Sequence, residues 1–246
     1  MTPARGELMV VETAEAFAEA GARLFADAAA AAQGRFVAGL AGGSTPKSIY
    51  RRLAEPPYRT SLRWDAMDLV PGDERFVAHD SPDSNLHMIR GALIDRLDHP
   101  VGGLHAVPFE GLTVDRAAAA YEQTLKDLYG HETLRPEQPF FDICFLGMGD
   151  DGHTASLLPG QPDLLDERQR WVLPVTKGRP ESRVTLTYPV LESSRVVVFV
   201  VSGEGKRAML DAILSGRDTT VPAARLQPQG RLLWLADRAA AGRWAS

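Results

Sequence analysis

One stretch decides the fold of this 246-residue chain: Phe140-Phe141-Asp142-Ile143-Cys144-Phe145-Leu146-Gly147-Met148-Gly149-Asp150-Asp151-Gly152-His153. Its first half holds aromatic and apolar residues over the length of one strand, and the glycines end that run abruptly. We therefore predict a buried central strand that ends in a tight loop. Ligands of open α/β sheets bind at such carboxyl ends of strands.

The loop after this strand carries one histidine among three glycines and two aspartates. The glycines let the backbone approach a ligand and adopt positive φ. His153 can exchange a proton near neutral pH, and Asp151 can orient its ring or balance its charge. The loop therefore predicts a general base, His153, supported by Asp151.

Gly147, Gly149 and Gly152 also match the dinucleotide fingerprint G-x-G-x-x-G. However, Asp150 and Asp151 would put negative charge beside the pyrophosphate that this fingerprint binds. Acidic residues do occur about 20 positions after the glycines, but they lie before the next strand candidate. In a dinucleotide-binding protein, the acid that binds the ribose lies near the end of that strand. We therefore expect no nicotinamide or flavin cofactor.

Strand candidates alternate with helix-length segments along the chain. Strands are expected over residues 35–40, 68–70, 104–107, 140–146, 171–176, 184–187, 196–201 and 232–235. Helices are expected over residues 13–33, 46–53, 85–97, 115–129, 206–215 and 237–244. This alternation predicts one α/β domain over residues 1–246, Rossmann-like, with a mainly parallel central sheet flanked by helices.

Composition argues against several classes of protein. The chain is 44% hydrophobic and 24% charged, and its net charge of −5 without a basic cluster argues against a nucleic-acid partner. No apolar segment reaches the ~18 to 20 residues that span a bilayer, and residues 1–6 lack a signal-peptide pattern, so we expect a cytoplasmic protein without membrane attachment. The single cysteine, Cys144, lies in the predicted central strand and is expected to be a buried structural thiol.

The histidines give no metal-binding pattern. His79 and His87 are near one another, but their spacing matches no standard zinc motif, and the other histidines are scattered through the chain. We therefore expect no metal site.

Three further motifs also follow predicted strands. In Gly42-Gly43-Ser44-Thr45-Pro46, Thr45 is a natural N-cap and Pro46 suits the first helical position, which together predict a helix N-terminus and an anion site. Arg75 follows the second strand candidate and could fork onto phosphate or carboxylate oxygens. Lys206 follows the strand at 196–201 and could meet a phosphate as a point charge.

Each motif alone has an ordinary structural explanation: a capped turn, a surface ion pair of Arg75 with Asp73 or Glu74, or a solvated lysine. A parallel sheet would bring all four strand ends to one edge, however. We therefore predict that the motifs form one shared site.

These motifs resemble those of the 6-phosphogluconolactonases, a family related to glucosamine-6-phosphate deaminase. The resembling segments are residues 42–46, 73–77, 84–85, 146–156, 183–187, 203–206 and 230–237. They occur in order over nearly the whole chain, and the Asp-Gly-His-Thr-Ala-Ser stretch at 151–156 is specific. The resemblance implies hydrolysis of 6-phosphoglucono-δ-lactone to 6-phosphogluconate in the oxidative pentose phosphate route, without a metal or organic cofactor.

The reading from the residues requires the same parts that the resemblance implies. A lactone is an activated ester, so a base-assisted water can attack its carbonyl. His153 is the expected base, and Asp151 is expected to hold its ring or support its cationic form. The expected substrate- and phosphate-binding residues are Gly43, Ser44, Thr45, Asp73, Arg75, Asn85, Gly152, Arg183 and Lys206.

Two alternatives stay open at this point. A glucosamine-6-phosphate deaminase would share the Asp-Gly-His core, although Thr154 to Gly160 resembles the lactonase version and the deaminase pattern generally lacks an arginine at the position of Arg75. A noncatalytic sugar-phosphate sensor would not need the pair Asp151 and His153. The expected oligomeric state is a monomer, with a weak dimer left open.

Two side chains near the expected site have no assigned direction. Asp150 departs from the usual family pattern, and a carboxylate pointing into the site would oppose a phosphorylated ligand. Arg183 is expected to bind the substrate, and an ion pair with Glu181 is the structural alternative for it.

Overall fold

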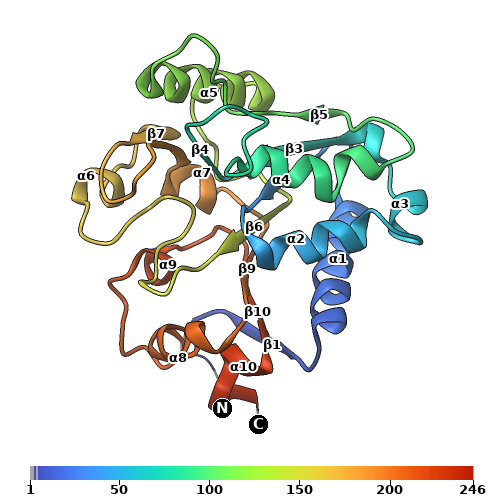
Figure 1. The fold of residues 1–246 in the computed structure, drawn as a ribbon, viewed down its shortest axis with the longest axis vertical. Coiled ribbons are helices and arrows are strands. Elements are labelled where there is room, and N and C mark those ends of the chain that lie inside the picture. Colours follow the sequence, from blue (N-terminus) through green and yellow to red (C-terminus); the bar gives the residue numbers. More distant parts are fainter. Residues whose placement is uncertain (1–2, 4, 246) are drawn as a thin grey trace.

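A central parallel sheet separates two layers of helices in the computed structural model, which describes residue 3 and residues 5–245 (Figure 1). Within these residues the sheet has seven strands, and its neighbouring strands pair in parallel. The strand order is β1 (Glu7–Val11), β10 (Arg231–Asp237), β9 (Val196–Val201), β6 (Ile143–Gly147), β2 (Phe36–Leu40), β3 (Met67–Pro71) and β5 (Gly103–Leu104). The predicted mainly parallel α/β sheet is confirmed.

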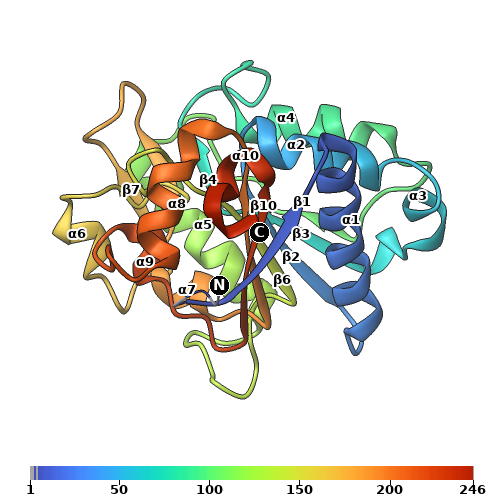
Figure 2. The same cartoon turned by 90° about the horizontal axis from the view of Figure 1, so that it is seen from below.

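Helices cover both faces of this sheet, as the two views at right angles show (Figures 1 and 2). The helices are α1 (Ala14–Ala31), α2 (Ser44–Leu53), α3 (Tyr58–Ser61), α4 (Asn85–Ala92), α5 (Val114–Tyr129), α6 (Pro162–Leu165), α7 (Tyr188–Glu192), α8 (Arg207–Leu214), α9 (Pro222–Arg225) and α10 (Arg238–Ala241). None of the helices in the described part of the chain has both the length and the apolar character needed to cross a membrane.

Strand β9 shows why the core has two halves. Its side chains alternate between the faces of the sheet because successive residues of a strand point in opposite directions. Val197, Phe199 and Val201 belong to a core with α5, α7 and α8, whereas Val198 and Val200 belong to a core with α1, α2 and α4. A strand covered on both faces needs apolar residues at every position, which explains its unbroken valine-rich sequence.

Aromatic side chains fill the space between sheet and helices on each face. On one face, the ring of Phe25 from α1 packs against Phe36, Trp64 and Phe145. On the other, the Phe199 ring stacks on Trp234 of the neighbouring strand with 4.3 Å between centroids. Cys144 of β6 is fully buried between these layers, as predicted, and burial raises the pKa of its thiol.

A second, antiparallel sheet lies beside the main one. It consists of β4 (Asp73–Arg75), β8 (Arg183–Leu186) and β7 (Val172–Val175) in that order. The sequence predicted strands near 171–176 and 184–187 but did not separate them from the main sheet. The short connection 176–182 decides the matter, because neighbouring parallel strands need a crossover of a dozen or more residues whereas antiparallel strands need only a hairpin.

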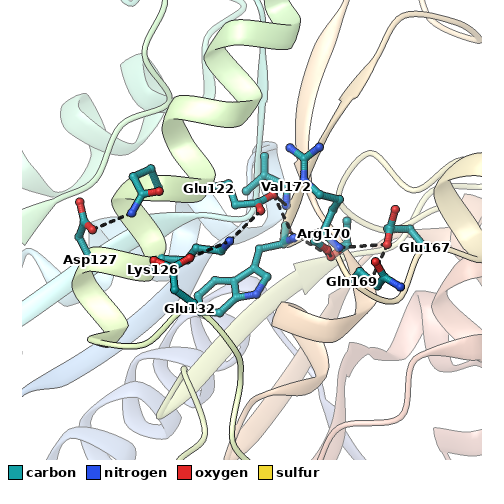
Figure 3. Close-up of polar contacts among 11 residues, drawn as sticks. Glu122, Lys126, Asp127, Glu132, Glu167, Gln169, Arg170 and Val172 are labelled. Atoms are coloured by element: carbon teal, nitrogen blue, oxygen red, sulfur yellow. Dashed lines mark hydrogen bonds and ion pairs between the residues drawn. The ribbon is translucent and has the colours of Figure 1, made fainter.

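Glu122 of α5 attaches this small sheet to the rest of the molecule (Figure 3). Its Oε2 accepts hydrogen bonds from Arg170 Nε at 2.7 Å and from the backbone amides of Trp171 at 3.2 Å and Val172 at 3.3 Å. Its Oε1 lies 3.2 Å from Lys126 Nζ, and Lys126 also contacts Glu132. This cluster fixes the start of β7 and therefore the hairpin that leads to β8.

Several element boundaries differ from the prediction. Strand β1 was missed, because it is a short edge strand with partly exposed side chains, and β4 was missed because it holds three polar residues. The helix expected over 85–97 ends at Ala92, and a 3₁₀ turn follows over Ile94–Arg96. The terminal helix likewise divides into α10 and a 3₁₀ turn.

Candidate active site

A cleft of about 270 Å³ opens at the carboxyl ends of four adjacent strands, β9, β6, β2 and β3. The predicted motifs follow these four strands, so the parallel order brings them together as expected. The predicted site residues that line the cleft are Gly43, Ser44, Thr45, Asp73, Arg75, Asn85, His153, Arg183 and Lys206. Asp151 and Gly152 belong to the same loop as His153 but do not line the cleft.

The start of α2 forms one wall of the cleft and differs from the prediction in detail. The helix begins at Ser44, and the N-cap position is Gly43, whose φ of 104° favours glycine. The prediction that Thr45 is the N-cap was therefore wrong, because the turn occurs earlier than expected and leaves Thr45 inside the first helical turn. Its Oγ1 instead lies 2.8 Å from Ser202 Oγ. The helix N-terminus still lines the cleft, where its free amides favour an anion.

His153 and Asp151 form a close pair at the edge of the cleft. The His153 Nδ1 atom lies 2.5 Å from Asp151 Oδ1, and the His153 backbone amide donates to the same oxygen at 3.1 Å. The loop is closed by hydrogen bonds from the Gly149 amide to the His153 carbonyl and from the Gly152 amide to the Gly149 carbonyl. Because Nδ1 is engaged by Asp151, the ring nitrogen left for proton transfer is Nε2.

Asp151 is ionised at neutral pH. Its partial burial opposes ionisation, but hydrogen bonds from the backbone and ring of His153, together with one from Arg179, outweigh this effect and lower the pKa of Asp151 to about 2. The pair thus has a carboxylate beside the imidazole at any pH where the enzyme would work. A carboxylate in this place stabilises the protonated form of the ring.

Arg179 also contacts this pair and was not predicted. Its Nη2 lies 3.1 Å from Asp151 Oδ2 and 3.0 Å from His153 Nδ1. The residue belongs to the connection between β7 and β8, far from the His153 loop in sequence. No motif of the chain marks it, and the signal that finds it is the distance between the hairpin and the loop in the folded molecule.

Asp73 is a buried carboxylate on the floor of the cleft. Its Oδ2 accepts a hydrogen bond from Ser156 Oγ at 2.6 Å, and the Asn85 amide donates to its backbone carbonyl at 2.9 Å and to its Oδ1 at 3.3 Å. Ser156 belongs to the stretch at 151–156, but no separate role was predicted for it. These contacts fix the directions of Asp73 and Asn85 before any ligand binds.

Glu74 has a structural role next to this floor. It is buried and accepts hydrogen bonds from the backbone amides of Asn85 and Leu86 at 2.7 Å each and from Ser84 Oγ at 3.0 Å. These groups form the start of α4, whose first amides have no partner within the helix. Glu74 therefore holds α4, and with it Asn85, against β4.

Among the residues that the structure describes, three cationic side chains line the cleft. Arg75 donates from Nη1 to the Asp83 carbonyl at 2.5 Å, a different contact from the ion pair with Asp73 or Glu74 that was its ordinary structural alternative. Arg183 is half-buried, and burial lowers the pKa of its guanidinium, with Asp73 opposing this shift and the nearby Arg75 adding to it. Lys206 Nζ lies 2.6 Å from Asp150 Oδ1, so the direction of Asp150, which the sequence left open, is toward this lysine.

The chain matches a known protein family over most of its length. The family model described as glucosamine-6-phosphate isomerases/6-phosphogluconolactonase matches residues 12–234. A 6-phosphogluconolactonase of a Nostoc species is 43% identical over 217 residues, which cover 87% of each chain. The human 6-phosphogluconolactonase is 39% identical over 251 residues, covering 97% of this chain and 94% of the human one.

Solved structures agree with this relationship. The 6-phosphogluconolactonase of Trypanosoma brucei superposes with a TM-score of 0.82 at 28% identity, covering 97% of this chain and 98% of that chain. The superposed part of the chain includes the strands of both sheets, because it covers almost the whole chain. The chain belongs to the family of glucosamine-6-phosphate isomerases and 6-phosphogluconolactonases.

Proposed function

We propose that this protein hydrolyses 6-phosphoglucono-δ-lactone to 6-phosphogluconate in the pentose phosphate pathway. The observation that carries the proposal is the pair of His153 and Asp151 at the edge of a cleft whose other walls hold cationic side chains and a helix N-terminus. The relatives described above, which are 6-phosphogluconolactonases, support it. A glucosamine-6-phosphate deaminase or a noncatalytic sensor is not favoured by these relatives.

His153 is the proposed general base. As a water attacks the lactone carbonyl, Nε2 takes a proton from that water, and Asp151 stabilises the imidazolium that forms. The tetrahedral intermediate then expels the ring oxygen, which receives the proton from Nε2 as the C–O bond breaks. The products are a carboxyl group and a free hydroxyl, and the imidazole returns to its neutral form. Water and a base suffice for this hydrolysis, so the proposed mechanism requires neither a metal nor an organic cofactor.

The remaining residues are proposed to bind the substrate. The helix N-terminus at Ser44 and Thr45 and the cations Arg75, Arg183 and Lys206 suit the phosphate group.

The carboxylate of Asp73 and the amide of Asn85 are held by neighbouring groups and suit sugar hydroxyls, which both donate and accept hydrogen bonds. Gly43 allows the turn that opens the helix N-terminus to the phosphate. Gly152 stays a predicted binding residue, although its carbonyl accepts a hydrogen bond from the Ala223 amide. The cytoplasmic location and the monomeric state also stay predictions.

The substitution His153→Asn tests this mechanism. Loss of freshly generated 6-phosphoglucono-δ-lactone is followed with wild-type protein, with the variant and without protein, because the lactone also opens spontaneously. We expect a fall in turnover of roughly 10²- to 10⁴-fold, the range typical of general acid–base catalysis. The exposed His99 provides a matched control, since His99→Asn removes a histidine away from the cleft.

The possible results separate the residue from the reaction. An unchanged rate in the His153 variant would remove this residue from the mechanism but leave the activity. Failure of folded wild-type protein to accelerate the loss would refute the lactonase proposal. Ammonia release from glucosamine 6-phosphate and binding of sugar phosphates without turnover would then be measured.

A further inference from the structure

Arg179 lies where it can act on the base without lining the cleft. Its side chain extends from the connection between β7 and β8 and places Nη2 3.1 Å from Asp151 Oδ2 and 3.0 Å from His153 Nδ1. It is partly buried, with 29% of its side chain exposed, and so is the His153 side chain, with 26% exposed. One guanidinium nitrogen therefore contacts both members of the proposed catalytic pair.

Arg179, Asp151 and His153 cannot make all of these hydrogen bonds at the same time. A guanidinium only donates, so it can bond to Nδ1 only when that nitrogen lacks a proton. When Nδ1 carries a proton, this proton is directed to Asp151 Oδ1 at 2.5 Å, and Arg179 retains its bond to Oδ2. In that second arrangement Nε2 has a free lone pair, and a positive charge remains next to the ring.

This positive charge opposes a second proton on His153. Asp151 acts in the opposite direction, because a carboxylate beside an imidazole favours the imidazolium. A base held by a carboxylate alone would be protonated over more of the acidic range and would then be unable to accept a proton from water. A cation at 3.0 Å from the same ring offsets part of this effect.

We propose that Arg179 is a positioning residue that keeps His153 unprotonated near neutral pH by balancing the charge of Asp151. The catalytic part of this proposal rests on the lactonase function proposed above. The electrostatic part concerns the free protein and does not depend on the substrate. Arg179 does not itself need to touch the lactone.

Other charged groups face the same region but differ in their contacts. Arg75, Arg183 and Lys206 line the cleft, Asp73 lies on its floor, and Asp150 is paired with Lys206. The polar contacts of the His153 ring in the described residues are with Asp151 and Arg179. Asp151 and Arg179 should therefore have the largest effect on the protonation of His153. The other charged groups are the same in all the variants described below, so their effect should not change.

The substitution Arg179→Met tests the proposal in the free protein. Titration of the His153 ring signal by NMR, assigned through its loss in His153→Asn, gives the pH at which the ring is half protonated. We expect this midpoint to rise by about half to one pH unit in Arg179→Met, as one unit charge a few ångströms away gives about 1 kcal/mol in a solvent-like medium. Arg179→Lys should return it most of the way to the wild-type value.

Lys177 provides the matched control because it is an exposed cation on the same connection. Lys177→Met removes the same charge, and we expect it to move the midpoint far less than Arg179→Met. Equal shifts in the two variants, or no shift in Arg179→Met, would overturn the proposal. If Arg179→Met does not fold, Arg179→Gln is titrated in its place.

The activity profile provides a second readout. The acidic limb of kcat/KM should move to higher pH in Arg179→Met by about the same amount as the NMR midpoint, and Arg179→Lys should restore it. A merely structural role would lower the plateau of the profile without moving this limb, and that result would also overturn the proposal. If wild-type protein does not hydrolyse the lactone, the function proposal fails, whereas the NMR titration still decides the role of Arg179.

Discussion

Two consecutive carboxylates, Asp150 and Asp151, take different partners within one loop. Asp151 turns to His153, and Asp150 turns to Lys206, whose ammonium we propose as a phosphate ligand. Because Asp150 is 77% exposed, it can leave this lysine for water at little cost. Its charge nevertheless lies next to a proposed phosphate site and competes with the phosphate for the same cation.

Replacing Asp150 with Asn should therefore improve binding. We expect KM for the phosphorylated lactone to fall by about two- to five-fold with kcat unchanged, since exposed ion pairs contribute up to about 1 kcal/mol. Steady-state kinetics of Asp150→Asn give both constants. Asp163→Asn, which removes an exposed carboxylate on α6, controls for the change in net charge. A higher KM in Asp150→Asn would show instead that Asp150 holds Lys206 in place for binding.

At the scale of residues, the sequence predicts those site residues that belong to a motif and have a suitable side chain. The loop with His153 and the cation Lys206 could be predicted because each follows a strand, and strand ends meet in a parallel sheet. Arg179 and the direction of Asp150 could not. Both depend on which side chains meet across loops from different parts of the chain, and these distances exist only in the folded molecule.

Among the elements, the hairpin of β7 and β8 matters most for the site, because it carries Arg179 and Arg183. Helix α5 holds the start of this hairpin through Glu122, whose side chain is only 9% exposed. Burial opposes ionisation of this carboxyl, but Arg170, the Val172 amide and Lys126 outweigh it and lower the pKa of Glu122. The ionised form therefore stabilises the docking of the hairpin.

The substitution Glu122→Gln should lower the free energy of unfolding by about 2 kcal/mol at pH 7, because it leaves buried donors with a weaker acceptor. A lowered pKa in the folded state means that the stabilisation is complete above the unfolded pKa of about 4.3 and is lost as pH falls through the folded value. The difference between wild type and variant should therefore shrink below about pH 4.

Urea unfolding at a series of pH values measures this difference. Glu132→Gln is the control, because Glu132 contacts the same Lys126 but is 74% exposed, so its loss should cost less than about 1 kcal/mol. Equal losses in the two variants, or a difference that grows in acid, would contradict this account of Glu122.

The elements themselves could be predicted where their pattern was long or strongly apolar, as in α1, α5 and β9. Strands β1 and β4 could not, because a few partly exposed or polar residues become strands only when a neighbour supplies hydrogen bonds. The antiparallel pairing of β7 with β8 could have been inferred from the short connection 176–182. The pairing of β8 with β4 could not.

For the molecule as a whole, the side chains around the cleft include a group of cations although the chain has a negative net charge. The chain has a net charge of −5, yet Arg75, Arg183 and Lys206 surround the cleft. A phosphorylated substrate is repelled by the surface and attracted by the site. Mobile ions weaken both interactions, but the attraction in the cleft acts at shorter range and decides the affinity.

Salt should therefore raise KM for the lactone. Between about 20 and 200 mM sodium chloride we expect KM to increase roughly two- to five-fold with little change in kcat. The reason is that the Debye screening length falls from about 20 Å to under 10 Å over this range. Initial rates at several chloride concentrations measure this effect. Lys206→Met should have a higher KM at low salt and a flatter dependence, and an equally steep dependence in this variant would argue that Lys206 does not meet the phosphate.

The position of β1 has a consequence for how the protein is made. Glu7 at the start of β1 pairs with Arg231 of β10, which lies 224 positions later in the chain. At about 5 to 20 residues per second, the ribosome needs roughly 10 to 45 s to deliver the strand on which β1 docks. During that interval the first strand has no partner in the sheet, while β2 and β3 can already pair. This edge of the sheet can therefore assemble only after β10 has been made, and a nascent chain stalled before β10 would present an open edge at β9 to the cell.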